Sequence, residues 1–496
     1  MNTNAIISEH IFIFPFSFRD NKKAKKNIYV GMDFEKNKFN NLTNWTINYS
    51  NINDDKDYNE FVYFYKPIRV ALYTIYNQSN VVKNYTYKHI SKQQGQTVNI
   101  TVKAKEYKLS IKDIRLRLYK TGIGMLTFEL VNKEYTTIEA LEAINSFSKM
   151  IYPPTMPLKK AQREGFPEKI SIWLNKKDCI MELFDTDYYK EPLMISKLIM
   201  DVLGPNFSDN NRLGKYRDII IEPILGNQMF CCCVCQNSEC NQYGLDEDID
   251  KDKLETFMTI NKYRSYIGES SYIKNEYSVY GINRYMLLCL TREWKEARLY
   301  NQLVTLVLMQ RATLLNLSTE IARISTLPKY QLSDAISNVY EIYVQFINQL
   351  YFKEVTEEEE GARIYEELSK IFKIELELEQ LNFEIDEVYE YTTLVERTSS
   401  NMKVQLLTIT GAALVIPSFV TGFFGMNIFK DEAIHWWKYK EVISWLNSYV
   451  LLPIVLVIII CTWTKRKEIR YVILKVLLLA ILIYSLFMTI KYGYTL

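Results

Sequence analysis

Five cysteines crowd one short stretch of the chain, and clustered thiols can bind a metal ion or change redox state. Zinc sites usually pair two such clusters at a distance. Here the other cysteines and the three histidines form no second cluster. We therefore favour a buried strand in a reducing cytosol, and a metal or redox site stays open as the alternative. The cluster, MFCCCVCQNSEC, holds Cys231, Cys232, Cys233, Cys235 and Cys240.

A second candidate for chemistry is a single asparagine that closes an apolar run. The run LVIPSFVTGFFGMNIF, residues 414–429, carries Asn427 near its end, and Asp431 and Glu432 follow shortly after it. An asparagine amide is neutral, yet it both donates and accepts hydrogen bonds. One interpretation is that Asn427 only ends a helix, because Asn is tolerated in left-handed C-terminal positions. The other interpretation, a role for Asn427 in binding a cation, depends on the apolar runs around it.

The sequence contains no motif of a common enzyme class. We find no Walker loop, no dinucleotide fingerprint and no nucleophile elbow, so neither enzymatic activity nor an organic cofactor is predicted. Basic and acidic residues balance, 60 against 58, and this balance argues against direct nucleic-acid binding. The N-terminus lacks the basic region of a signal peptide, so the first 400 residues are expected in the cytosol.

Hydrophobic patterning divides the chain at about residue 290. Residues 1–290 mix strand-like stretches, such as HIFIFPFSF and RLRLYKTGIGMLTFELV, with an amphipathic helix that starts after Thr137. Residues 291–402 are helical in pattern, and we interpret them as a stalk. The expected fold class is an α+β cytosolic domain that feeds a long helical stalk and C-terminal transmembrane helices.

The stalk is strongly acidic and has a heptad-like apolar seam. Residues 354–396 contain fifteen acids and only three bases. No Pro or Gly occurs between Ala362 and Met402, so one unbroken helix is predicted. The seam can pack on its own domain or against copies of itself. Its members are Ile364, Leu368, Ile371, Ile374, Leu378, Leu381, Ile385 and Val388.

Three apolar runs follow the stalk. The first lies within residues 403–427, and its nineteen residues from Leu406 to Phe424 carry no charge and are enough to cross a bilayer. A loop, 428–445, separates it from a second run, 446–464, and a third run at 471–490 is a possible further span. Basic residues directly follow the second run, so the loop is predicted outside and the N-terminal domain inside. These features predict a multi-pass protein of the inner membrane, in contact with the lipid bilayer.

The stretch SNMKVQLLTITGAALVIPSFVTGFFGMN resembles the inner span of CorA-type divalent-cation transporters. The shared features are Asn401-Met402-Lys403, Pro417 and the terminal Gly425-Met426-Asn427. The resemblance covers residues 345–467, and it is weak over the first 290. It implies a homopentameric funnel in which the Gly-Met-Asn rings form the outer mouth of a pore. By the same resemblance, the pore is lined by Val404, Leu407, Val415, Ser418 and Gly422.

In such a pore Asn427 would act on hydrated Mg²⁺. Mg²⁺ gives up its water reluctantly, and a ring of amide oxygens can accept hydrogen bonds from that water without holding the ion too tightly. Asp431 and Glu432 would concentrate cations, unless they are ordinary loop residues. The family also suggests that the acidic stalk binds regulatory divalent cations.

Two functions therefore compete at this point. The first is a channel or transporter for Mg²⁺ or another divalent cation. The second is a gated pore of the same fold whose N-terminal domain binds a nucleotide messenger, as in CorA-like effectors of type III CRISPR antiviral defence. The long, divergent N-terminal domain and the third apolar run suit the second function, but the cation transporter is the primary prediction.

Overall fold

The structure is a computed structural model of the whole chain. It divides into two compact units, Met1–Tyr389 and Glu390–Leu496. The residues that it describes are 6–20, 37–76, 80–90, 95–151, 167–174, 178–183, 195–209, 219–226, 228–236, 254, 258, 270–293, 295–425, 479, 480, 482–484 and 487.

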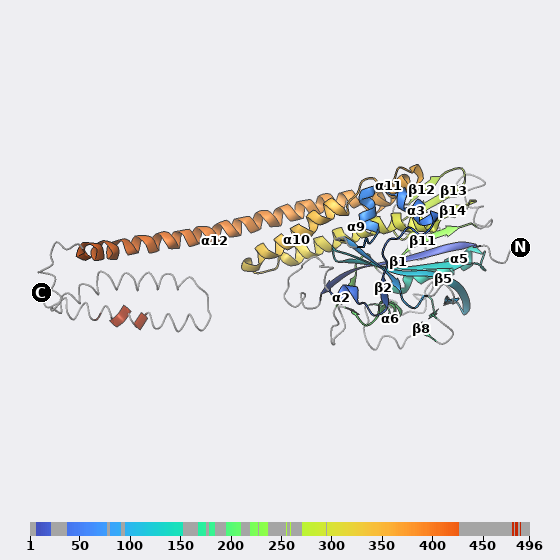
Figure 1. The fold of residues 1–496 in the computed structure, drawn as a ribbon, viewed down its shortest axis with the longest axis horizontal. Coiled ribbons are helices and arrows are strands. Elements are labelled where there is room, and N and C mark those ends of the chain that lie inside the picture. Colours follow the sequence, from blue (N-terminus) through green and yellow to red (C-terminus); the bar gives the residue numbers. More distant parts are fainter. Residues whose placement is uncertain are drawn as a thin grey trace. The chain divides into compact units, whose positions relative to one another are not determined.

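Fourteen strands form one mixed sheet (Figure 1). Its main path runs β12-β13-β14-β11-β1-β6-β5-β4-β7-β8, with β10, β9, β3 and β2 attached beside it. All pairs are antiparallel except β11 with β14 and β10 with β9. The strands are β1 (Ser8–Asp20), β2 (Trp45–Ile47), β3 (Val82–Tyr87), β4 (Thr97–Val102), β5 (Lys105–Tyr119), β6 (Ile123–Asn132), β7 (Lys169–Trp173), β8 (Cys179–Leu183), β9 (Phe207–Asp209), β10 (Ile219–Pro223), β11 (Phe230–Cys235), β12 (Ser271–Lys274), β13 (Ser278–Ile282) and β14 (Met286–Thr291).

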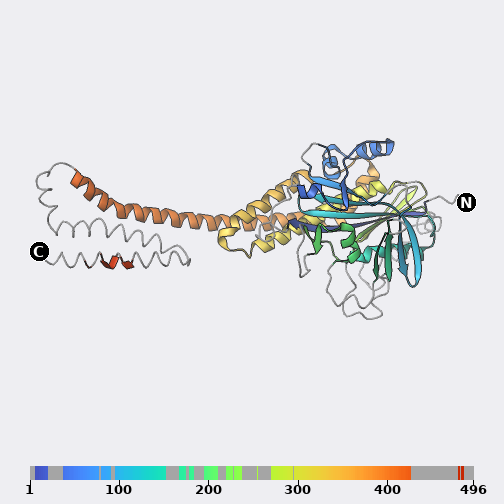
Figure 2. The same cartoon turned by 60° about the horizontal axis from the view of Figure 1, so that its bottom comes forward.

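The helices are short before residue 290 and long after it. Figure 2 shows the strong twist of the sheet that they cover. The helices are α2 (Asn37–Asn40), α3 (Asp55–Tyr63), α4 (Lys66–Leu72), α5 (Ile138–Asn145), the 3₁₀ helix η1 (Ser146–Ile151), α6 (Lys197–Leu203), α9 (Ala297–Ile324), α10 (Lys329–Gln349), α11 (Glu359–Ile371) and α12 (Ile374–Gly425).

Strand alternation sends side chains into two hydrophobic cores, one on each face of the sheet. On β1, Phe12 and Phe14 enter the core beneath α5 and α6, whereas Ile11 and Ile13 enter the core beneath α9. The second core also receives residues of α4, α10, α11 and the start of α12. The central strands of the sheet are therefore buried on both faces, and any charged side chain within them needs a partner.

The predicted fold class is wrong. Within the described part of the chain, none of the helices combines the length and the apolar character that a membrane crossing requires. The first apolar run is only the end of the 52-residue helix α12, which begins with Glu375 and Glu377 in its first turn. The run at 446–464 lies outside the described residues, as does most of the run at 471–490.

The same finding overturns several linked predictions. The CorA-like funnel with transmembrane helices, the multi-pass inner-membrane location and the description as a membrane protein are corrected. In place of a modest α+β domain, the structure has a 14-stranded mixed sheet with its long helices in the C-terminal half. The apolar run and the acidic residues from Glu375 onward form a single helix, α12.

The unbroken stalk helix is also corrected. α11 ends at Ile371 and α12 starts at Ile374, because Lys373 between them adopts a left-handed conformation with φ of 53°. The apolar seam packs on its own domain: Ile364, Leu368 and Ile385 are buried in the core beneath α9. Of the two interpretations of the seam, the structure therefore supports the first.

The cysteine cluster forms the buried strand that its sequence predicted. Cys231, Cys232, Cys233 and Cys235 all lie on β11, and all are free and buried. Burial raises the pKa of each of the first three thiols well above its ordinary value. Cys240 lies outside the described residues.

We expect these thiols to resist alkylation in the folded protein, because only the thiolate is a nucleophile and burial suppresses it. Iodoacetamide labelling followed by peptide mass mapping should show Cys179, which is partly exposed, labelled first. The β11 peptide should be labelled only after guanidinium is added. Equal rates for Cys179 and the β11 thiols without denaturant would contradict the buried strand.

Candidate functional site

The residues assigned to a pore lie along the end of α12 or beyond the described residues, and their assignment stays a prediction. Val404, Leu407 and Val415 are exposed on α12 by 57%, 72% and 63%. Ser418 and Gly422 are exposed on the same helix, and Gly425 is its last residue. Met426, Asn427, Asp431 and Glu432 lie outside the described residues. The action of Asn427 on Mg²⁺ therefore stays a prediction.

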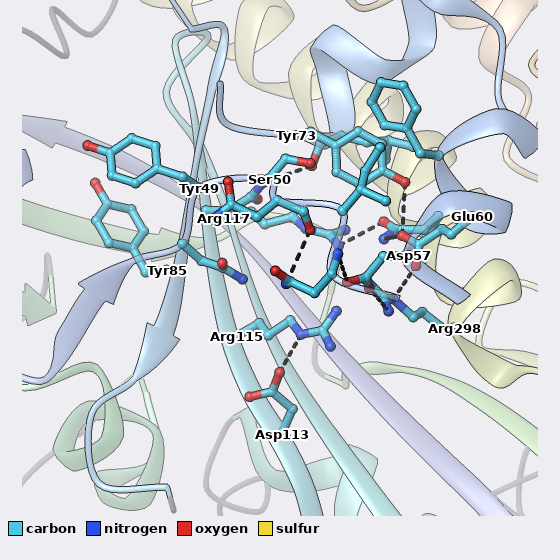
Figure 3. A pocket seen from close by; sticks show the side chains of 18 of the residues that line it. Tyr49, Ser50, Asp57, Glu60, Tyr73, Tyr85, Asp113, Arg115, Arg117 and Arg298 are labelled. Atoms are coloured by element: carbon cyan, nitrogen blue, oxygen red, sulfur yellow. Dashed lines mark hydrogen bonds and ion pairs between the residues drawn. The ribbon is translucent and has the colours of Figure 1, made fainter. Parts of the chain in front are cut away.

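The structure places its polar groups elsewhere, around a cavity of about 450 Å³. The walls come from α3, the loop before it, β3, β5 and the first turns of α9 (Figure 3). Arginines, carboxylates, amides and tyrosines line these walls together. The residues come from positions between 48 and 302, so only the folded chain brings them together.

A β-bulge in β5 positions the arginines. The register of β5 against β6 shifts between Ile111 and Asp113, and such a shift moves the following side chains to the opposite face. After the bulge, Ile114 and Leu116 enter the core beneath α5 and α6. Arg115 and Arg117 consequently alternate with them and face the other side, where both line the cavity.

Two of the three cavity arginines are held by carboxylates. Arg115 Nε donates to Asp113 Oδ2 at 2.6 Å, and its Nη1 lies 3.5 Å from Glu129 Oε1. Arg298 Nη1 donates to Asp57 Oδ1 at 2.9 Å, and its Nε forms an ion pair with Glu60. Burial alone would lower the pKa of both guanidinium groups, but the neighbouring carboxylates raise it.

Glu60 is the centre of this network. Its side chain is 2% exposed, and its Oε1 accepts hydrogen bonds from Gln302 Nε2 at 2.6 Å and from the Tyr73 hydroxyl at 2.9 Å. With the Arg298 ion pair, a carboxylate of α3 is thus joined to two side chains of α9. This arrangement fixes the wall of the cavity opposite Tyr49 (Figure 3).

Arg117 differs from its two neighbours. The residue is 4% exposed, and no carboxylate of the described residues forms an ion pair with it. Its Nη2 donates to Gln302 Oε1 at 2.7 Å, and the Tyr119 hydroxyl lies close to the guanidinium, but Nη1 is buried without a well-formed hydrogen bond in the described structure. Burial lowers the pKa of Arg117, yet a guanidinium group stays charged in proteins. The cavity therefore holds a buried positive charge with a free donor.

The opposite wall supplies a free acceptor and aromatic rings. Asn84 Nδ2 donates to the Leu72 carbonyl at 2.8 Å, but its Oδ1 is buried with no partner in the described part of the chain. Tyr49 and Tyr85 line the same side (Figure 3), and the Tyr49 ring is 38% exposed. Free donors, free acceptors and aromatic faces in one cavity are the usual parts of a small-molecule site.

Sequence reasoning did not identify this cavity, although one signal was present. The stretch RLRLYKTGIGMLTFELV was interpreted as a strand, and its alternation of arginine with leucine places both arginines on one face. In a sheet covered on both faces, such a row of arginines must meet carboxylates or a ligand. The partners on α3 and α9 could not be identified without the fold.

The fold and the cavity define a large mixed α/β domain with a polar, arginine-bearing ligand cavity. No protein-family model, curated protein or solved structure matches the chain. Within the described residues, no group of three or more His, Cys, Asp or Glu side chains could hold a metal ion. The cavity is therefore the feature of the molecule from which a function can be inferred.

Proposed function

We propose that the unit Met1–Tyr389 is a ligand-binding domain whose cavity recognises a small anionic nucleotide. The observation that carries the proposal is the buried guanidinium of Arg117, with no carboxylate partner and a free Nη1 donor. Removing such a charge from water is unfavourable unless something pairs with it. A phosphate group accepts two parallel hydrogen bonds from the planar guanidinium, and this charge-assisted pair is among the strongest that arginine forms.

The remaining walls favour a nucleotide over a bare phosphate. A volume of about 450 Å³ lies within the usual range of small-molecule sites. Tyr49 offers an exposed ring for stacking on a base. The free Oδ1 of Asn84 can accept a hydrogen bond from an amino or hydroxyl group. These groups support the nucleotide-messenger alternative among the functions weighed from the sequence.

The proposal is tested by calorimetric titration of the purified protein with mono-, di- and cyclic nucleotides, adenosine and inorganic phosphate. At least one nucleotide should bind, adenosine should bind much more weakly, and phosphate should compete at high concentration. Arg117→Met, which keeps most of the side-chain volume, should weaken nucleotide binding about tenfold to a hundredfold, because it removes a charge-assisted hydrogen bond.

A matched control is available on α9. Arg323→Gln removes one positive charge from an ion pair with Glu320 and lies outside the cavity lining. This variant should bind like the unchanged protein. If no nucleotide binds, or if Arg117→Met and Arg323→Gln bind equally well, the cavity is only an ion-pair network that joins the sheet to the helices.

A further inference from the structure

A second cavity, of about 190 Å³, lies on the α9 face of the sheet, away from Arg117. Most of the residues that line it are apolar, among them Phe230 on β11, Leu308 and Leu315 on α9, and Phe372 at the break between α11 and α12. Two arginines, Arg284 and Arg311, line the same space. Apolar walls that carry two cations are suited to a ligand with an anionic head and a compact apolar tail.

One of these cations already holds a carboxylate. Arg311 Nη1 lies 2.6 Å from Glu377 Oε1, and Glu377 stands in the first turn of α12. Arg284 is exposed and forms no ion pair with any of the described residues. The cavity thus contains one guanidinium that is ion-paired but whose buried Nη1 makes no hydrogen bond within the described residues, and a second guanidinium that can take a carboxylate.

We propose that this cavity binds a small amphipathic carboxylate. The carboxylate would pair with Arg284 and share Arg311 with Glu377, while the tail would contact Leu308, Leu315 and Phe372. Since the Phe230 and Phe372 rings already meet at a centroid distance of 6.0 Å, the tail would extend an existing apolar contact. Ligand binding would then compete with Glu377 beside Lys373, where the helix breaks with φ of 53°.

The test uses hexanoate as the probe, with acetate and hexan-1-ol as matched controls, by saturation-transfer NMR and calorimetric titration. Hexanoate should bind, whereas acetate lacks the tail and hexanol lacks the charge, so both should bind at least about tenfold more weakly. No binding of hexanoate, or equal binding of acetate, would overturn the proposal.

Three substitutions locate the probe. Arg284→Gln lies on the surface and should weaken hexanoate about tenfold, whereas Glu377→Gln should strengthen it severalfold because Arg311 loses its competitor. Arg117→Met should leave hexanoate binding unchanged, which separates this site from the nucleotide cavity. If Arg284→Gln has no effect, or if Arg117→Met removes hexanoate binding, the second cavity is not the site.

Discussion

Glu60→Ala is expected to lower the free energy of unfolding by about 3–5 kcal/mol, the cost of removing one partner from a buried ion pair. Glu60 forms an ion pair with Arg298 and accepts hydrogen bonds from Gln302 and Tyr73. Alanine would leave three donors on α9 and the segment after α4 without their shared acceptor. Each buried donor left unpaired adds a desolvation cost.

The measurement is urea unfolding followed by circular dichroism, with Asp57→Ala as the matched control. Asp57 also pairs with Arg298, but its side chain is 19% exposed, so water can replace it. Asp57→Ala should therefore lower the free energy of unfolding much less than Glu60→Ala. Equal losses of unfolding free energy for both variants would show that Arg298 is held by the nonspecific electrostatic attraction of nearby carboxylates and not by the hydrogen-bonded Glu60 network.

The Glu60 network bears on function because it leaves Arg117 without a carboxylate partner among the described residues, although Arg117 still donates to Gln302. Glu60 engages Arg298 and Gln302, and the carboxylates Asp113 and Glu129 engage Arg115. No acid in the described cavity then remains for Arg117. A buried, charged arginine without a carboxylate partner lowers the stability of the fold. Proteins keep such unfavourable arrangements mainly at functional sites, such as ligand-binding sites.

Sequence patterning predicted the local elements better than their assembly. The alternation around Arg115 and Arg117 indicated a strand, and the cysteine cluster indicated a buried one; both are strands in the structure. The cavity could not be predicted, because Arg117 and Gln302 are 185 positions apart. Periodicity reports which residues share a face, but not which distant element covers that face.

For the helices too, the sequence predicted the local element but not what it packs against. The seam through Ile364 and Ile385 was visible as a spacing, but spacing alone could not distinguish packing on the domain from packing between copies. No Pro or Gly lies at the helix break at Lys373, so the sequence gives no signal of it. The helix break accompanies a tertiary contact, because Phe372 packs against Phe230 of the sheet. A contact between residues so distant in sequence cannot be predicted from local spacing.

Ile385→Asp should destabilise the domain itself by several kcal/mol, because it places a carboxyl group without a partner in the core. Ile385 is 1% exposed and packs beneath α9. Burial would raise the pKa of the new carboxyl in the folded state above its unfolded value. The unfolded chain would therefore ionise more readily, so the loss should grow as the pH rises above about 4 and shrink below it.

Phe383→Asp is the matched control, since Phe383 lies on the same helix and is 63% exposed. Urea unfolding at pH 4 and pH 7, with light scattering of each variant, measures stability and assembly separately. We expect Ile385→Asp to unfold at a much lower urea concentration at pH 7, and Phe383→Asp to unfold like the unchanged protein. The opposite pattern, a smaller assembly with an unchanged unfolding midpoint for Ile385→Asp, would mean that the seam joins copies of the chain, because a residue that contacts only other copies affects association without affecting the folding of one domain.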